Sequence, residues 1–508
     1  MKDGVRLAVV CGAFLWCLLG WAAADYIGGG IGLALGLATC VLPWWRQPLW
    51  SWAALYLRRN RPIELVESLS VANDRSGGGV RIHNDVAVTA LQVLGKPYRP
   101  TWLTGSTATH TANTLDITEL TPLMHQSLDL TIESITVVSS GSRRRSVGDY
   151  PRVYDTLIGT SPYAGRRETW MIIRIATLDN GEALQWRETV GTAALAAAQR
   201  ISAALRCRGI RVRVASASDM AELDKRLGSN SLEPRNRRWR SLRGDSGWNT
   251  TYAYRPVDIN AETLAQAWSL PADGITQNLT IFPDGSATAT VTVHTAQPAT
   301  TPPSVIVQTL PGEQAPAVAA NLCCPRPEIR GLRRGRLLRS LAIPIGPSGV
   351  LLGKTASGDR LLMPLRDPGH HSRVSVIADD LIAKRIVVRA AGAGERITVH
   401  TRDLQRWSSV RMPNVVVTDN PRPVPGTTVS VTDGTVQPAP RPTTVIAVNP
   451  SSIAQDSAAD VVITQIDPSA VRIDALGTSY EAEVEFFRAE NRYAAESAGI
   501  PADVMLVD

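Results

Sequence analysis

Two apolar runs open the chain and predict its first structural unit. Residues 7–24 hold 18 consecutive uncharged residues, residues 26–45 hold another 20, and only Asp25 separates the two runs. A bilayer core about 30 Å thick is crossed by about 20 apolar residues in a helix, so each run is long enough to span it. The pattern therefore predicts a transmembrane hairpin with a very tight connection. A signal peptide is the alternative interpretation of the first run, but Trp16, Trp21 and Asp25 would make a poor cleavage region.

Basic residues flank this hairpin and predict its orientation. Lys2 and Arg6 precede the first helix, Arg46 follows the second, and only an acidic residue lies between them. Because the cytoplasmic flanks of membrane helices are enriched in positive charge, both termini and the soluble domains should be cytoplasmic. Residues 48–57 are too few to span and should lie along the interface. The tryptophans and arginines expected at this interface are Trp44, Trp45, Trp50, Trp52, Arg58, Arg59 and Arg61.

Glycines in the second apolar run predict a helix-packing face. Gly28, Gly32 and Gly36 recur every four residues, which places them on one side of a helix. Small residues at this spacing let a partner backbone approach closely inside a membrane. The partner is either the first helix or another subunit, although glycine is also simply common in membrane helices.

Alternating strand and helix patterns in residues 62–228 predict a cytosolic α/β domain. Apolar residues recur at the helical period through 188–206, and Gly209 follows as a C-terminal cap. Strand–helix–strand order is typical of an α/β layer. The other elements expected here are a strand hairpin at 80–90, strands at 115–117, 128–138, 170–176 and 210–214, short helices at 119–126 and 219–227, and a loop at 139–167.

The second half of the chain predicts a β-rich α+β region at 251–508. Residues 229–250 precede it and contain five arginines, which predicts a polar, solvated linker; contact with lipid head groups is the alternative. Two segments, 298–327 and 413–442, each hold seven prolines and are expected to be extended connectors or loops. The strands expected in this half are at 279–282, 288–293, 349–352, 360–364, 374–378, 385–390, 396–400 and 480–487.

Composition and charge restrict the classes of function. The chain has 508 residues and a formal net charge of +7, of which residues 1–61 carry +4 (six basic against two acidic) and the remaining 447 residues carry +3. The basic excess therefore lies largely in one short segment, which argues against a nucleic-acid partner. The six cysteines form no disulfide framework and no zinc spacing, which fits a reduced environment for the bulk of the chain.

The sequence contains no complete catalytic motif. Residues 353–355 (Gly-Lys-Thr) match the end of a P-loop, but Ser348 stands where the first glycine is required and a strand pattern follows, so a hairpin turn is expected. The doublets at 370–371 (His-His) and 379–380 (Asp-Asp) are expected on loop surfaces rather than at a metal. Residues 159–163 lack the second glycine of a serine nucleophile motif. We therefore expect no catalytic, cofactor-binding or metal-binding residues.

Several longer strings carry a family resemblance. Residues 147–155 read Val-Gly-Asp-Tyr-Pro-Arg-Val-Tyr-Asp, and residues 162–170 read Pro-Tyr-Ala-Gly-Arg-Arg-Glu-Thr-Trp. These strings, with those at 73–80, 392–400 and 486–493, resemble the EccE family of mycobacterial type VII (ESX) secretion systems. The resemblance covers nearly the whole chain, including its two-helix start.

The resemblance implies a non-enzymatic structural subunit of a secretion machine. Such a subunit would contact membrane lipid, assemble with EccB, the ATPase EccC and EccD, and carry its soluble part at the outer edge of the complex. Two alternatives stay open: a membrane-tethered enzyme acting on a nucleotide or nucleotide sugar, and a module that recognises secreted substrates. The residues of the 139–167 loop and the following strand that could contact a partner are Tyr150, Arg152, Tyr154, Tyr163, Arg166 and Arg167.

Overall fold

The computed structural model describes most of the chain between residues 3 and 494. The residues it does not describe within these limits are 42, 45–46, 49–51, 53–54, 58, 60, 74–75, 106–107, 144–147, 186, 300, 338, 441 and 451–458. Of the expected interface residues, Trp45, Trp50 and Arg58 fall outside the described part, as does the side chain of Trp44.

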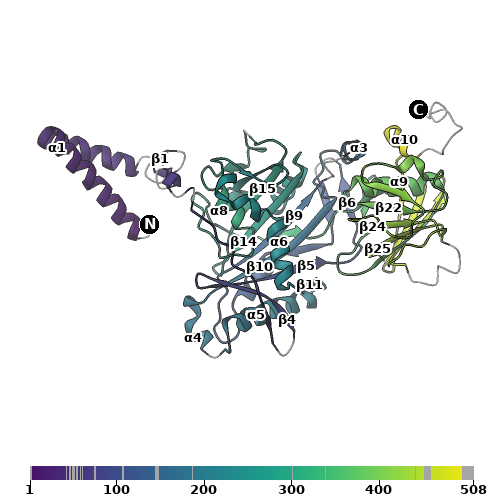
Figure 1. Cartoon of the computed structure of the whole chain (residues 1–508), viewed down its shortest axis with the longest axis horizontal. Coiled ribbons are helices and arrows are strands. Elements are labelled where there is room, and N and C mark those ends of the chain that lie inside the picture. Colours follow the sequence, from purple (N-terminus) through teal and green to yellow (C-terminus); the bar gives the residue numbers. More distant parts are fainter. Residues whose placement is uncertain are drawn as a thin grey trace.

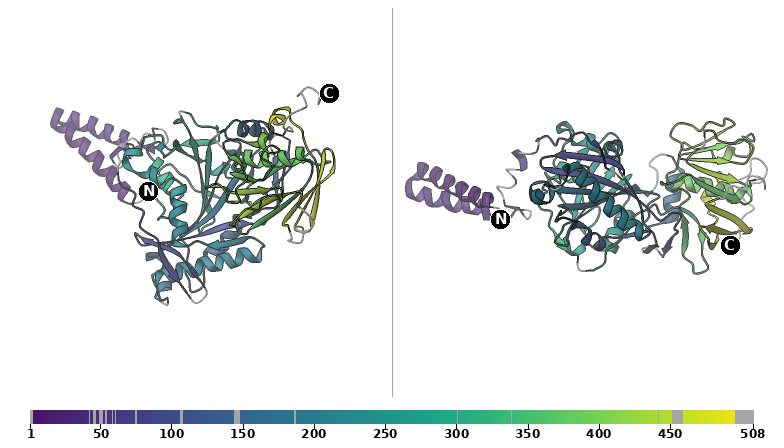
Figure 2. Two further views of the ribbon diagram at one scale, coloured as in Figure 1. Left: turned by 45° about the vertical axis from the view of Figure 1, so that its right-hand side comes forward. Right: turned by 90° about the horizontal axis from the view of Figure 1, so that it is seen from below.

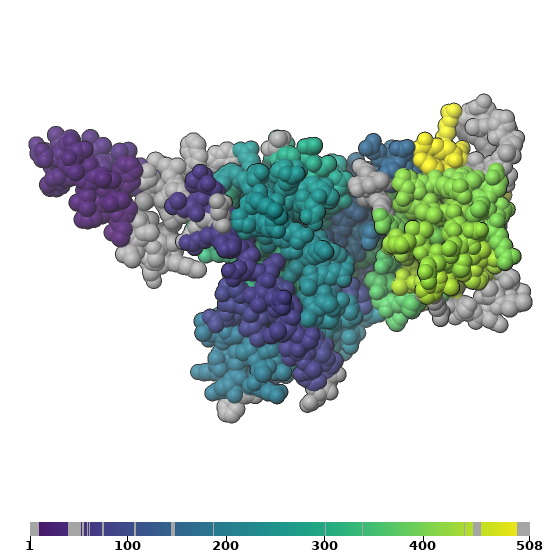
Figure 3. Space-filling model, viewed as in Figure 1, coloured from purple at the N-terminus to yellow at the C-terminus, as the bar shows by residue number. Residues whose placement is uncertain are grey.

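The N-terminal helix α1 (Asp3–Val41) is broken in its middle. Ala24 (φ −154°, ψ 42°) and Asp25 (φ 49°, ψ −143°) leave the helical conformation at the acidic residue between the two apolar runs. The helical stretches on either side lie next to each other and stand apart from the rest of the molecule (Figures 1 and 3). Within the described residues, Val10–Ala38 is the one stretch of helix long and apolar enough to cross a membrane.

The predicted glycine face lies between the two halves of α1. A Cβ added to Gly28 would fall 2.1 Å from the carbonyl oxygen of Gly20, and one added to Gly32 would fall 2.1 Å from that of Trp16. Gly36 is similarly close to the first half, and all three glycines are buried. The apolar side chains on the outside are exposed, with Phe14 at 62%. Because so much apolar surface is not stable in water, α1 suggests association with a membrane.

Two large sheets build the rest of the molecule (Figure 2). The first is antiparallel and runs in the order β12-β13-β15-β14-β9-β10-β5-β4-β3, with β11, β16 and β17 paired alongside β5, β13 and β15. Its strands are β3 (Leu69–Ala72), β4 (Gly77–His83), β5 (Val86–Gly95), β9 (Ser134–Ser142), β10 (Arg166–Ala176), β11 (Arg211–Val214), β12 (Leu242–Arg243), β13 (Trp248–Tyr254), β14 (Gly274–Ile281), β15 (Ser286–Thr295), β16 (Val307–Thr309) and β17 (Gly335–Arg336).

Helices cover both faces of this first sheet. On β5, Ala87, Leu91 and Val93 join a hydrophobic cluster with α5, whereas Val88 and Ala90 join a second cluster with α6 and α8, because successive side chains of a strand point to opposite faces. The α-helices that follow α1 are α3 (Tyr150–Ile158), α4 (Gly181–Leu184), α5 (Val190–Cys207), α6 (Ala217–Arg226), α7 (Ala261–Gln266), α8 (Gln314–Ala319), α9 (Asp380–Gly392) and α10 (Asn491–Ala494).

The second sheet combines a parallel and an antiparallel part. Its order is β23-β22-β24-β25-β21-β26-β27-β28-β19-β20-β6-β7, and the pairs from β23 to β26 are parallel. The strands are β6 (Thr101–Thr104), β7 (Ala108–Thr111), β19 (Val350–Lys354), β20 (Arg360–Met363), β21 (Ser372–Ile377), β22 (Ile397–His400), β23 (Val415–Thr418), β24 (Val429–Thr432), β25 (Thr444–Val448), β26 (Val461–Asp467), β27 (Ala470–Ala475) and β28 (Thr478–Glu483). Four short strands lie outside both large sheets: β1 (Pro43–Trp44) pairs with β2 (Gln47–Pro48), and β8 (Thr114–Asp116) pairs with β18 (Ala342–Pro344).

The sheets do not follow the expected domain boundaries. The predicted linker at 229–250 does not separate two units, because β14 pairs with β9 across it, with Ile281 opposite Ile135. In that segment, Leu232 and Leu242 are buried in the core. The exposed arginines around them give the segment the composition of a solvated linker. Conversely, β6 and β7 lie in the expected first domain but belong to the second sheet, where β6 pairs with β20.

Several local predictions also differ from the structure. The expected strand at 385–390 lies inside α9, and the helix brings Arg385 and Arg389, four residues apart, onto one face. The expected loop at 139–167 contains α3 and the ends of β9 and β10. The proline-rich segment 298–327 contains β16 and α8, and the segment 413–442 contains β23 and β24. Both segments can form these elements because their prolines lie mostly between them. By contrast, the predicted helix at 188–206 and the hairpins at 80–90 and 279–293 are confirmed.

Replacing Gly32 with leucine should separate the two halves of α1. The new side chain would begin 2.1 Å from the Trp16 carbonyl oxygen, whereas Gly30 is exposed and has nothing within 4 Å, so Gly30→Leu is the matched control. Overpacking of this kind costs about 1–3 kcal/mol. Spin labels at positions 10 and 38, in a chain without other cysteines, should report a longer and broader distance for Gly32→Leu alone. Equal distance distributions in both variants would contradict this packing.

Candidate functional site

The tyrosines of the expected contact loop lie between the two sheets. Tyr150, Tyr154 and Tyr163 are each at most 1% exposed, so the structure places them in the interior rather than on a surface. The Tyr154 hydroxyl accepts a hydrogen bond from the backbone N–H of Leu351 on β19 (3.0 Å), and the Tyr163 hydroxyl donates one to the Gly349 carbonyl (3.0 Å). These contacts attach α3, which lies in a connection of the first sheet, to the second sheet.

A buried carboxylate completes this junction. Glu490, near the C-terminal end of the described chain, pairs with Arg389 of α9 at 2.8 Å and accepts a hydrogen bond from the Tyr150 hydroxyl at 2.6 Å. Arg389 also donates to the Leu351 carbonyl, at 3.3 Å. Burial alone would lower the pKa of Arg389, but hydrogen bonds and attraction from Glu490 raise it above its ordinary value. Burial raises the pKa of Tyr150 well above its usual range, and the charge of Glu490 raises it further. The phenol therefore stays protonated and donates its hydrogen bond to Glu490.

Close backbone approach and a second arginine fix α3 in this position. A Cβ on Gly392 would fall 2.7 Å from the Tyr154 ring, so only glycine allows α9 to pack this closely. Arg143 donates to the carbonyl oxygens of Gly159 (2.6 Å) and Trp268 (2.8 Å) and pairs with Asp155 at 3.0 Å. The segment around α3 is therefore held on both sides.

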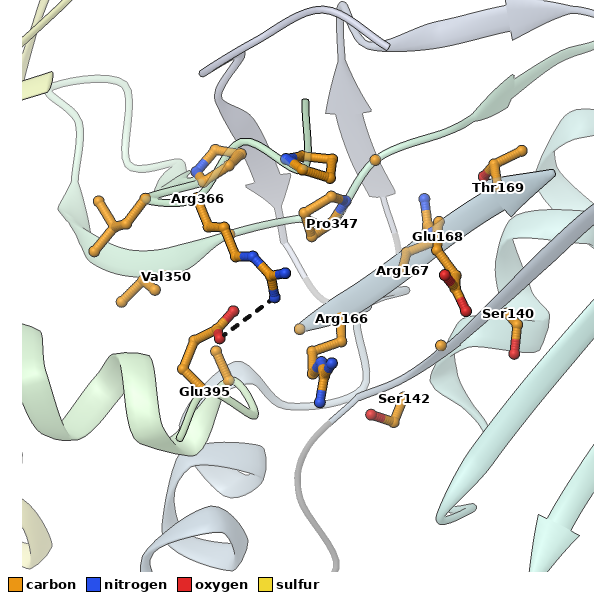
Figure 4. Close-up of a pocket in the computed structure, with 18 of the residues that line it drawn as sticks. Ser140, Ser142, Arg166, Arg167, Glu168, Thr169, Pro347, Val350, Arg366 and Glu395 are labelled. Carbon is orange, nitrogen blue, oxygen red and sulfur yellow. Dashed lines mark ion pairs between the residues drawn. The ribbon is translucent and has the colours of Figure 1, made fainter. Parts of the chain in front are cut away.

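A cleft of about 470 Å³ opens beside this junction (Figure 4). Arg366 and Glu395 lie across it from each other, with Nη1 and Oε2 4.0 Å apart. Arg166 and Arg167, at the start of β10, also line it, and within the described part of the chain neither pairs with a carboxylate. The Arg167 guanidinium lies over the Trp268 ring at 4.3 Å from the centroid. Burial lowers the pKa of Arg167 to about 9, so it remains charged at neutral pH.

The basic side chains of this cleft can hold a negatively charged group. No cluster of three metal-ligating side chains occurs among the described residues. The Gly-Lys-Thr segment ends β19 and enters a hairpin rather than the loop-to-helix turn of a phosphate-binding loop. Lys354 pairs there with Glu485 at 2.9 Å. In the acidic doublet, Asp379 caps the N-terminus of α9 and Asp380 pairs with Arg406.

The residues expected at the membrane interface that the structure describes with their side chains or carbonyls lie against the first sheet. Trp52 contacts Trp239 with ring centroids 5.9 Å apart, and the carbonyl oxygens of Arg59 and Arg61 accept hydrogen bonds from Arg237. The segment that follows α1 is therefore attached to the part of the chain that was expected to be a linker.

Sequence reasoning missed several residues of the junction. Arg389 and Glu490 were not singled out, because they pair with each other across about 100 residues of the chain. Arg143 was missed because its partners lie in a segment that was expected to be an irregular loop and at Trp268, 125 residues later. The four-residue spacing of Arg385 and Arg389 was the one local indication of a helical polar face. Arg152 and Arg166, by contrast, are exposed, as a contact surface requires.

Comparison with known proteins identifies the family. The model of "Putative type VII ESX secretion system translocon, EccE" matches residues 163–254. The chain is 48% identical over 515 residues to the ESX-2 secretion system protein EccE2 of Mycobacterium tuberculosis (strain CDC 1551 / Oshkosh), covering 97% of this chain and 96% of the relative. The chain belongs to the EccE family.

More distant EccE proteins are also similar. The ESX-1 secretion system protein EccE1 of Mycobacterium tuberculosis (strain ATCC 25618 / H37Rv) is 26% identical over 75% of this chain and 79% of its own length. The ESX-5 secretion system protein EccE5 of Mycobacterium marinum (strain ATCC BAA-535 / M) is 30% identical over 37% of this chain and 50% of its own length. The family-model match includes Tyr163, Arg166, Arg167 and the whole of β13, so it lies on the first sheet and reaches the junction.

Removing the buried carboxylate should destabilise the body of this EccE protein strongly. The Glu490 and Arg389 side chains are 0% and 1% exposed, and breaking a buried ion pair costs about 3–5 kcal/mol because the remaining charge stays unpaired. Glu481→Ala is the matched control, since Glu481 pairs with Arg472 at 3.0 Å with both side chains about half exposed, and such pairs contribute about 0–1 kcal/mol. Urea unfolding of the purified full chain, followed by tryptophan fluorescence, should show a much lower midpoint for Glu490→Ala alone. Equal midpoints would contradict the role given to Glu490.

Proposed function

We propose that this chain is a non-enzymatic structural subunit of a type VII secretion membrane complex. The observation that carries the proposal is the 48% identity with an ESX-2 EccE protein over nearly the full length of both chains. The structure supports a structural role because its buried polar groups join parts of the fold to one another. Arg389 and Glu490, for example, are satisfied within the chain.

We further propose that both halves of α1 cross the inner membrane, with both termini and the two sheets on the cytoplasmic side. The break at Ala24 and Asp25 and the antiparallel contacts of Gly20 with Gly28 support two crossings. The described helix after the break, 26–41, rises about 24 Å at 1.5 Å per residue, which is close to the thickness of a bilayer core. The charges before and after the hairpin support the orientation.

As partners we propose the other membrane components of the complex, EccB, EccC and EccD, and membrane lipid. The exposed apolar outer surface of α1 supports contact with lipid or with neighbouring membrane helices. Because the three tyrosines are buried, the contact surface proposed near α3 reduces to Arg152 and Arg166, with Arg167 partly exposed. A photo-crosslinking residue at position 152 distinguishes a fellow subunit from a secreted substrate as the neighbour of this surface.

Deleting the gene and restoring variants tests the structural role. Loss of the chain should stop secretion by its ESX system and reduce co-purification of the other membrane subunits, and the full chain should restore both. Lys354→Ala should restore them equally well, because the half-exposed Lys354 side chain lies at a hairpin and pairs with Glu485. An intact, secreting complex without this chain would contradict the proposal. Loss of secretion in a folded Lys354→Ala variant would favour the nucleotide-dependent alternative.

A further inference from the structure

A basic loop of the first sheet lies directly against the segment that leaves the membrane. The basic loop comprises residues 233–245, which hold five arginines and two acidic residues. Within it, Arg237 donates from Nη1 to the carbonyl oxygens of Arg61 (2.6 Å) and Arg59 (3.3 Å). Its Nε donates to the Leu232 carbonyl at 2.8 Å, so one guanidinium joins the basic loop to the chain that follows α1.

Aromatic contacts hold the same loop from two other sides. The rings of Trp239 and Trp52 lie 5.9 Å apart at 41°, which connects the basic loop to the interfacial segment a second time. The Trp239 carbonyl accepts a hydrogen bond from the Gly312 N–H at 2.7 Å, and a Cβ on Gly312 would fall 2.9 Å from the Trp239 ring. The position of the loop beside the segment that follows α1 is therefore fixed by contacts with residues 52, 59, 61 and 312.

The charge of this loop remains available to solvent. Arg238, Arg240 and Arg243 are exposed, and none of them pairs with a carboxylate within the described residues. Arg235 is exposed as well and pairs with Glu233 at 2.5 Å. Arg237 donates only to backbone carbonyls, so no acidic side chain neutralises it in the described structure. The loop thus keeps a positive excess next to the place where the chain enters the membrane.

We infer that the basic loop binds the anionic phospholipid headgroups of the cytoplasmic leaflet. The inference rests on the proposed membrane crossing of α1, which brings the loop to the bilayer surface. Arginines near such a surface are attracted to anionic lipids, and guanidinium groups match phosphate oxygens in charge and geometry. Tryptophan rings such as those of Trp52 and Trp239 favour the headgroup region, because the apolar part of the ring faces the lipid tails while its N–H group is hydrated. The loop is therefore a second attachment that holds the first sheet close to the lipid and limits its rotation about the chain after α1.

Hydrogen exchange in nanodiscs tests this inference on the full-length chain. Discs of phosphatidylcholine alone are compared with discs in which half of the lipid is phosphatidylglycerol. Exchange in residues 233–245 should slow by about fivefold or more in the anionic discs, and high salt should abolish the difference. Exchange in residues 401–411 of the second sheet should be the same in both kinds of disc.

Charge reversal supplies the variant and its matched control. Arg238→Glu with Arg240→Glu should remove the protection by anionic lipid, whereas Arg402→Glu with Arg422→Glu, two exposed arginines of the second sheet, should leave it unchanged. Equal exchange in both discs, or equal loss of protection in both double variants, would overturn the inference. Failure of the chain to enter discs of either composition would instead contradict the membrane crossing itself, so the two failures are distinguishable.

Discussion

A segment that crosses a bilayer must close its backbone hydrogen bonds within itself, and the proposed crossing of α1 places this constraint on the start of the chain. Each half of α1 meets it as a helix, and the glycines at 28, 32 and 36 allow the halves to pack with their backbones nearly in contact. The first sheet is attached through Arg237 and Trp239 to the segment that follows α1.

The body consists of two sheets that depend on each other at one junction. Strands from residues 101–111 complete the second sheet, although β5 before them and β9 after them belong to the first. The junction is then closed by α3, whose tyrosines contact β19, and by Glu490, which neutralises Arg389 in the interior. The Glu490 carboxylate binds partners on α9 and α3, which belong to different parts of the chain. The position of the second sheet therefore depends on the folding of both parts.

Local patterns in the sequence predicted part of this fold. The helix at 188–206 and the hairpin around 283–285 are properties of short segments, and the structure contains both at the expected residues. The pairing of β9 with β14 joins residues more than 130 positions apart, so no local pattern could reveal it. Tyr150 and Tyr154 lie in a stretch of mixed polarity that resembles a loop, and their burial is determined by β19 and α9, which come about 200 residues later. The run at 385–390 is too short for periodicity to distinguish a strand from a helix.

The placement of the body relative to the membrane is the central claim, and thiol labelling tests it most directly. Cys207 on α5 is exposed, and Asp25 lies at the break of α1, so chains with a sole cysteine at 207 or at 25 report on the body and on the far side of the membrane. With a membrane-impermeant maleimide on intact cells, the account predicts labelling of Asp25→Cys and labelling of Cys207 only after permeabilisation. Labelling of Cys207 in intact cells, with position 25 protected, would contradict it.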